Sequence, residues 1–165
     1  MATYDAASKE AMMPRTLSLR SLHAALVGGV LAVALAGPAR ADAPAGHFTD
    51  NKNGTVTANK TGLVWQRDIA PQPMTWIFAV DYCRNLPLAG GGWRLPSVKE
   101  LLTLVDRRLK NPSIDPVFFP KAPAETFWTS SSLNADPTQA LWVVNFSLGL
   151  SGFIDRGDVY VRCVR

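Results

Sequence analysis

The sequence predicts one α+β domain, in which two helices pack on short antiparallel sheets. Apolar residues recur at i, i+3, i+4 and i+7 in two central segments, residues 75–87 and 96–109, as on the buried face of a helix. Runs rich in β-branched and aromatic residues flank these segments, in residues 48–67 and 126–163. The chain has 165 residues, which is enough for one domain of ordinary size.

The amino-terminal segment has the layout of a secretory signal peptide. Residues 24–37 read AALVGGVLAVALAG without a charge, and Ala39 and Ala41 supply the small side chains that a signal peptidase recognises. A membrane-spanning helix needs about 20 apolar residues, so we favour a cleaved signal peptide over an anchor. We therefore expect a signal peptide over residues 1–41, a linker over residues 42–47 and a domain over residues 48–165.

The mature protein would then have no membrane span and would be periplasmic, secreted or held at the cell surface. Its charge gives little support to nucleic-acid binding. The whole chain has 17 Lys and Arg residues against 13 Asp and Glu residues. Residues 1–41 hold four of the basic and two of the acidic side chains, which leaves 13 against 11. Nucleic-acid-binding domains usually carry a strong basic patch, so we expect no nucleic-acid partner.

Cys83 and Cys163 are the two cysteines of the chain. An even count in an exported protein favours one disulfide. The alternative is a pair of buried free thiols. Two distant cysteines and His47 do not match the close ligand pairs of a zinc site, and we expect neither a metal nor a cofactor.

A β-hairpin is predicted near the start of the domain. Asn53-Gly54 is a strong turn signal, and residues 55–57 and 63–65 read as short strands around a turn at residues 59–62. The acidic run before Gly54 resembles a calcium loop. Aligned with that loop, however, Thr49 stands where an Asp is needed, so we favour the hairpin.

The first helix is predicted to begin after Thr75, with Trp76, Ala79, Val80 and Cys83 on its buried face. The second is predicted to begin near Pro96 and to extend to Leu109 along one apolar face.

The glycines at 90–92 lie between these helices and lack the strand and the Gly-Lys-Ser/Thr run of a phosphate loop. Lys99 and Glu100 project about 100° apart and cannot act as one pair. We therefore expect Arg94 and Glu100 to serve the fold.

Three strands are predicted in the last third of the chain. Trp142, Val144 and Phe146 share one face of the first, residues 150–154 form the second, and the last carries Val159, Val161 and Cys163 on one face. Of the five tryptophans, Trp65, Trp76 and Trp142 are expected in the core, while the environments of Trp93 and Trp128 stay open.

Six segments resemble, in chain order, motifs of the Lcl C-terminal domain family: FTDNKNGTVTANKTGLVWQR, TWIFAVDYCRNL, GGWRLPSVKELLTLVD, NPSIDPVFFP, FWTSSS and the pair WVVNF and VYVRCVR. The resemblance covers about residues 48–165. The Trp-Arg-Leu-Pro run and the last cysteine are also similar to C-type-lectin-like and formylglycine-generating-enzyme folds. The resemblance implies a C-type-lectin-like single domain, in which a long disulfide joins the first helix to the last strand.

The family is named for a bacterial collagen-like adhesin, and the resemblance implies binding to sulfated polysaccharides. This chain lacks a Gly-X-Y stretch and the Glu-Pro-Asn and Trp-Asn-Asp runs of many animal lectins. The cations that fit an anionic ligand are Arg107, Arg108 and Lys110 at the expected end of the second helix, with Lys121 beyond it. Alternatively, these cations only stabilise the negative end of that helix, by about 0.3–1 kcal/mol each.

We therefore expect an exported binding module for sulfated or otherwise anionic polysaccharide or surface glycans. A structural or assembly subunit that binds an envelope protein is the alternative. We expect no enzyme. The paired cysteines that formylglycine-type oxidation would use are expected in the disulfide, and residues 149–152 are one residue short of a Gly-x-Ser-x-Gly motif. A Ser-His-Asp arrangement would depend on His47, close to the mature amino terminus.

Overall fold

The computed structural model describes residues 46–134 and 140–165. The expected signal peptide and residues 42–45 of the expected linker lie outside the described residues. Within the described part, no helix is long and apolar enough to cross a membrane. Two helices and two small antiparallel sheets make up the domain, which confirms the α+β class.

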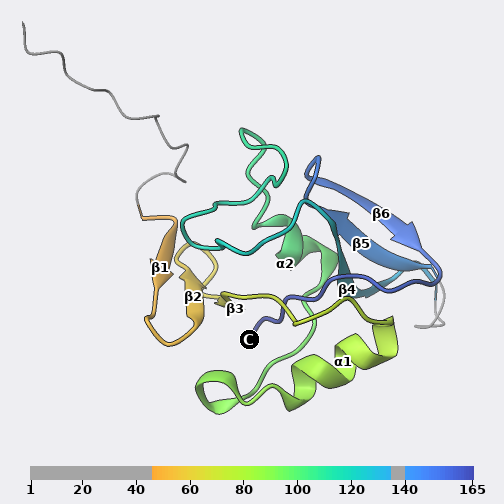
Figure 1. Cartoon of the computed structure of the whole chain (residues 1–165), viewed down its shortest axis with the longest axis horizontal. Helices are drawn as coiled ribbons and strands as arrows, with labels where there is room; N and C mark the ends of the chain where they lie inside the picture. The colour runs from red at the N-terminus through yellow and green to blue at the C-terminus, as the bar shows by residue number, and fades with distance from the viewer. Residues whose placement is uncertain (1–45, 135–139) are drawn as a thin grey trace, which may run out of the picture. The chain divides into compact units, whose positions relative to one another are not determined.

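The first sheet is the predicted hairpin with one additional strand before it (Figure 1). It consists of β1 (Phe48–Asp50), β2 (Thr55–Ala58) and β3 (Val64–Gln66) in that order. The turn between β1 and β2 needs Gly54, whose φ of +83° is a conformation that other residues rarely adopt. Val56 and Trp65, which are paired across β2 and β3, are fully buried.

Helix α1 (Trp76–Asn85) begins after Thr75, as predicted, and buries Ala79 and Cys83 completely. Trp76 and Val80 are half-buried on the same face. The helix ends two residues before the predicted boundary because Leu86, which precedes Pro87, adopts an extended conformation. The clash between a proline ring and the preceding residue disfavours a helical conformation at that position.

The second sheet contains β4 (Thr126–Ser132), β5 (Leu141–Asn145) and β6 (Leu150–Ile154), paired in chain order. Helix α2 (Val98–Leu102) contacts β4 and β5. The first core cluster joins apolar residues of α2 and of one face of this sheet, among them Leu101, Phe127 and Val144, to Val56 and Trp65 of the first sheet. The second cluster joins α1 to the other sheet face through Ala79, Trp128 and Val143 among others. The sheet is therefore covered on both faces.

Helix α2 is shorter than predicted, because it ends at Leu102 and not at Leu109. In a longer helix, the Asp106 N–H would donate to the carbonyl of Leu102. It donates to the carbonyl of Ser113 instead, at 2.9 Å. Pro96 lies just outside the helix, before the N-cap residue Ser97, and not in the first turn.

The last predicted strand is instead an extended segment that forms isolated bridges. Val159 pairs with Met74, Tyr160 with Phe127 and Val164 with both Trp65 and Arg94, so residues 159–165 connect the two sheets (Figure 1, dark blue). Val159, Val161 and Cys163 point into the second core cluster, as their alternation predicted.

Cys83 and Cys163 form the predicted disulfide, which spans 80 residues of sequence. Both cysteines are fully buried, with their Cα atoms 5.5 Å apart. Gln66 reinforces the same junction. Its Nε2 donates to the Tyr82 hydroxyl of α1 at 2.8 Å, and its Oε1 accepts from the Cys163 N–H at 3.1 Å. Helix α1, strand β3 and the carboxyl-terminal segment are thus fastened at one point.

Candidate functional site

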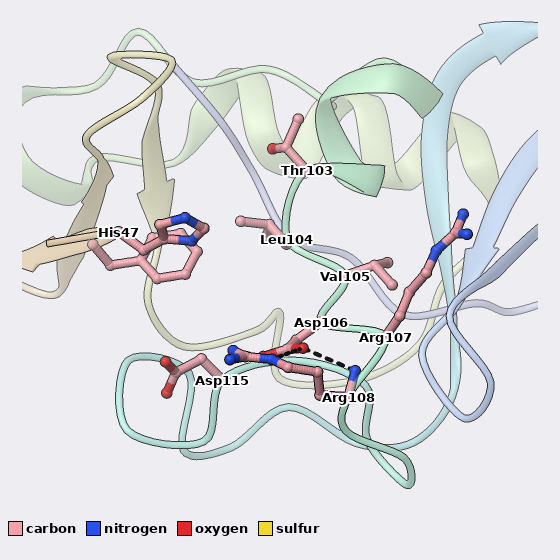
Figure 2. Close-up of a pocket in the computed structure, with 9 residues that line it drawn as sticks. His47, Thr103, Leu104, Val105, Asp106, Arg107, Arg108 and Asp115 are labelled. Carbon is pink, nitrogen blue, oxygen red and sulfur yellow. Dashed lines mark hydrogen bonds and ion pairs between the residues drawn. The ribbon is translucent and has the colours of Figure 1, made fainter. Parts of the chain in front are cut away.

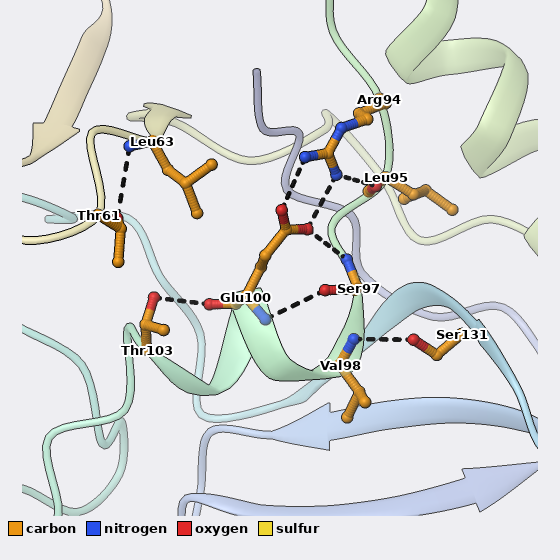
Figure 3. Close-up of polar contacts among 9 residues, drawn as sticks. All are labelled: Thr61, Leu63, Arg94, Leu95, Ser97, Val98, Glu100, Thr103 and Ser131. Atoms are coloured by element: carbon orange, nitrogen blue, oxygen red, sulfur yellow. Dashed lines mark hydrogen bonds and ion pairs between the residues drawn. The ribbon is translucent and has the colours of Figure 1, made fainter.

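In the stretch from the glycines to α2, Arg94 and Glu100, which were expected to serve the fold, form an ion pair that was not predicted from the sequence. Arg94 and Glu100 form two hydrogen bonds, Nη2 to Oε1 at 2.7 Å and Nη1 to Oε2 at 2.9 Å (Figure 3). Glu100 also completes a capping box, in which its carboxylate accepts from the Ser97 N–H and the Ser97 hydroxyl accepts from the Glu100 N–H. These contacts fix the start of α2.

The same contacts explain the ionisation of Glu100. The hydrogen bonds from Arg94 are the largest cause, the contacts with Ser97 add to them, and partial burial opposes them. Together they lower the pKa of Glu100 from 4.5 to about 2. A carboxyl group with so low a pKa stays ionised at neutral pH and cannot act as a general acid there.

The predicted cations lie on a loop and not on a helix. We call residues 103–110 the cation loop. Thr103 ends α2 by donating its hydroxyl to the Glu100 carbonyl at 2.7 Å. The loop is then held by Ser113, whose carbonyl accepts from the Asp106 N–H and whose hydroxyl donates to the Phe146 carbonyl at 2.8 Å. The cation loop is therefore attached to the end of β5.

Asp106 fixes the direction of Arg108. The Arg108 Nε donates to Oδ1 at 2.9 Å and its Nη2 donates to Oδ2 at 2.6 Å. The Arg108 hydrogen bonds lower the pKa of Asp106 and, conversely, raise the pKa of Arg108. A guanidinium has five N–H donors, and within the described residues the Nη1 group of Arg108 has no hydrogen-bond partner. Arg108 is thus held in place with donors to spare.

The other three predicted cations differ from Arg108 in their partners. Arg107 and Lys110 are exposed, and neither has an ion-pair partner in the part of the chain that the structure describes. Lys121 is paired with Asp68, with its Nζ 2.8 Å from Oδ2. The structure therefore brings Arg107, Arg108 and Lys110 together on one loop and places Lys121 in a separate ion pair.

An open cavity of about 340 Å³ lies beside the cation loop. The cation loop forms one wall. Asp115, from the loop before β4, and His47 and Phe48, at the start of β1, complete the lining. Figure 2 shows that Arg108 extends toward Asp115, whereas Arg107 extends in the opposite direction from the same loop. Of the predicted cations, Lys110 and Lys121 do not line this cavity.

His47 and Phe48 were not predicted as site residues. Their separation of about 60 residues from the cation loop left no signal in the sequence, because the contact depends on how the hairpin folds back. Phe48 packs against Phe118 and Phe119, with ring centroids 5.4 Å apart in both pairs. Its ring is therefore held firmly at the edge of the cavity.

Two of the five tryptophans are less buried than expected. Trp65 is in the core as predicted, and Trp93 and Trp128 are buried as well. Trp76 and Trp142, which were expected in the core, are only half-buried. The ring of Trp142 meets the exposed ring of Phe153 at a centroid distance of 6.1 Å.

The structure is a small α+β domain in which one long-range disulfide joins helix α1 to the carboxyl-terminal segment and an open, partly cationic cavity lies at the surface. The model of the Lcl C-terminal domain family matches residues 54–165. The chain belongs to this family. No curated protein and no solved structure matches the chain. The disulfide is compatible with an extracellular protein, because disulfides persist in oxidising compartments.

Proposed function

We propose that the protein is an exported binding module, periplasmic or at the cell surface, that binds a sulfated or otherwise anionic polysaccharide through the cation loop. The observation that carries the proposal is the placement of Arg107 and Lys110. Both are exposed and lack an ion-pair partner among the described residues. Helix α2 ends five residues before Arg107, too far for stabilisation of its last turn to account for the cation.

Arg108 supports the same function by a different route. Asp106 neutralises part of its charge but fixes the guanidinium beside the cavity. A side chain that is already ordered loses less conformational entropy when it binds a ligand. A sulfate or carboxylate group could then accept hydrogen bonds from the Nη1 donors of Arg108, while Arg107, which extends in the opposite direction, would contribute only through the local positive field.

Binding, and not catalysis, is the function that we propose. The two cysteines that formylglycine-type chemistry would use are joined in a fully buried disulfide. Glu100 is ionised and engaged by Arg94. The cavity is also lined by three other titratable side chains, which lie near Arg108, a residue whose position suits anion binding: His47, Asp106 and Asp115.

The test is charge reversal at the two unpaired cations. The Arg107→Glu/Lys110→Glu double variant should bind immobilised heparin about tenfold more weakly at 0.1 M salt and should keep its unfolding temperature, since neither side chain holds the fold. Wild-type retention should fall as salt rises, because the Debye length shrinks from about 10 Å at 0.1 M to about 3 Å at 1 M. Unchanged retention of a folded double variant would rule out the cation loop.

A second candidate function, subunit of an envelope assembly, is favoured by a different surface. Ile77 and Phe78 are adjacent on α1 and are 60% and 65% exposed. Large exposed apolar side chains that lie together often mark protein contacts. Under this alternative, an Ile77→Ser/Phe78→Ser variant would lose co-purifying envelope proteins while heparin binding remained. If the variant retains the same co-purifying proteins as the wild type, this alternative fails.

A further inference from the structure

The cavity beside the cation loop continues into a second one. The second cavity, of about 300 Å³, is lined by His47, Phe48, Thr103 and by the β2–β3 turn, which contributes Ala58, Lys60 and Thr61. Three of these residues, His47, Phe48 and Thr103, also line the first cavity. Because they share these three side chains, the two cavities are neighbours, and we treat them as two parts of one groove.

The chemistry of the groove changes along its length. Lys60 is exposed at one end and has no ion-pair partner among the described residues. Arg107 and Arg108 stand at the other end. Between the two ends, the held ring of Phe48 offers an apolar surface, and His47 and Thr103 offer polar groups. Two carboxylates also lie at the arginine end: Asp106 is paired with Arg108, and Asp115 lines the cavity on the side toward which Arg108 extends.

We propose that this groove holds a linear polyanionic sugar chain, and that Lys60 contacts it while Lys121 does not. This inference rests on the proposed function and assigns the second half of the binding site, the part that Lys60 lines. A small anion would satisfy only one end of the groove. A chain with repeated anionic groups reaches both ends, and the apolar faces of its sugar rings can pack on Phe48 between them.

The two lysines provide a matched comparison. Lys60→Glu and Lys121→Glu change the net charge by the same amount, so a difference in affinity reports the local contact and not the overall field. Affinity of the purified protein for a heparin-derived octasaccharide should be measured by calorimetry at 0.1 M salt, with thermal unfolding as a check on the fold. Lys60→Glu should weaken binding by about threefold or more, and Lys121→Glu should leave it within about twofold.

Ligand length gives a second readout. A heparin-derived disaccharide should bind more weakly than the octasaccharide, and Lys60→Glu should not change its affinity, because it occupies the arginine end alone. If Lys60→Glu binds the octasaccharide as the wild type does while Arg107→Glu/Lys110→Glu binds it more weakly, the groove is wrong and the cation loop stands. If all the variants bind as the wild type does, the proposed function fails and the groove fails with it.

Discussion

Arg94 and Glu100 illustrate how much one contact can do at the level of residues. Sequence reasoning predicted that both serve the fold, and the reason lies in their six-residue separation across Pro96, which allows a two-point ion pair at 2.7 and 2.9 Å. The same carboxylate caps α2. One side chain therefore joins the segment before the helix to the helix itself.

The pH dependence of stability should report this contact. The folded-state pKa of Glu100, about 2, lies below its ordinary value of 4.5, so its stabilisation is complete above about pH 5 and is lost as the pH falls toward 2. Because Arg94 is half-exposed, we expect Glu100→Gln to cost only about 1–2 kcal/mol of unfolding free energy at pH 7. Urea unfolding of both proteins at pH 7, 5 and 3 measures this loss of unfolding free energy.

The matched control is Glu125→Gln, which removes an exposed carboxylate without an ion pair among the described residues. That variant should unfold like the wild type at each pH. The difference between Glu100→Gln and wild type should shrink as the pH falls, because protonated Glu100 loses its ionic contact. A difference that stayed constant from pH 7 to pH 3 would contradict the ionic origin of the stabilisation.

Arg162 shows a limit of pattern reasoning at the same scale. Arg162 alternates with Val161 and Cys163, which face the second core cluster, yet Arg162 is itself only 1% exposed. Its Nη1 donates to the carbonyls of Gln66 and Arg67, both at 2.6 Å, and its guanidinium lies 4.6 Å from the ring centroid of Phe119. Periodicity describes one face of a strand and cannot foresee a loop that covers the other.

Among the helices and strands, the difference from prediction that matters most for the candidate site is the early end of α2 at Leu102. The apolar spacing continues to Leu109, and so the sequence predicts a long helix. Ser113 competes for the backbone N–H of Asp106 and redirects the chain. That competition is a tertiary effect, since it needs the loop at Ser113 to be fastened to Phe146. Local propensity could not reveal it.

Gly149 should be intolerant of substitution, because it supports the cation loop. Its φ is +70°, and a Cβ atom there would lie 2.6 Å from Cγ1 of Val105. We expect Gly149→Ala to lower the unfolding free energy by about 2–3 kcal/mol, through backbone strain and overpacking together. Gly152→Ala is the control, because a Cβ atom there meets nothing within 4 Å. Equal urea midpoints for the two variants would contradict this packing.

The disulfide stabilises the junction of α1 with the carboxyl-terminal segment. Closing an 80-residue separation should contribute about 4 kcal/mol in the chain-entropy model and often less in practice. The Cys83→Ala/Cys163→Ala variant should therefore melt well below the wild type. Reduction should destabilise the wild type and leave the variant unchanged. If the variant melted at the wild-type temperature, residues 159–165 would be held by their backbone bridges alone.

For the whole molecule, the α+β class, the two helices and the disulfide were predicted from the sequence, whereas β1 and β4 were not predicted as strands and the last predicted strand is not one. The confirmed predictions depend on periodicity, turn residues and cysteine count, all of which are local or compositional. Sequence reasoning recovered only part of the candidate site. The cation loop was visible because its cations are adjacent in sequence, whereas His47, Phe48 and Lys60 approach it only after the hairpin folds back.

The proposed binding of an anionic polysaccharide along the cation loop and its groove can be tested residue by residue. The most direct measurement is a ¹H–¹⁵N NMR titration of the protein with a heparin-derived oligosaccharide at 0.1 M salt. We expect shift changes that concentrate at His47, Lys60, Thr103, Arg107 and Arg108, and that reverse when salt is raised to about 1 M. Changes confined to α1 around Ile77 and Phe78, or no changes at saturating ligand, would contradict it.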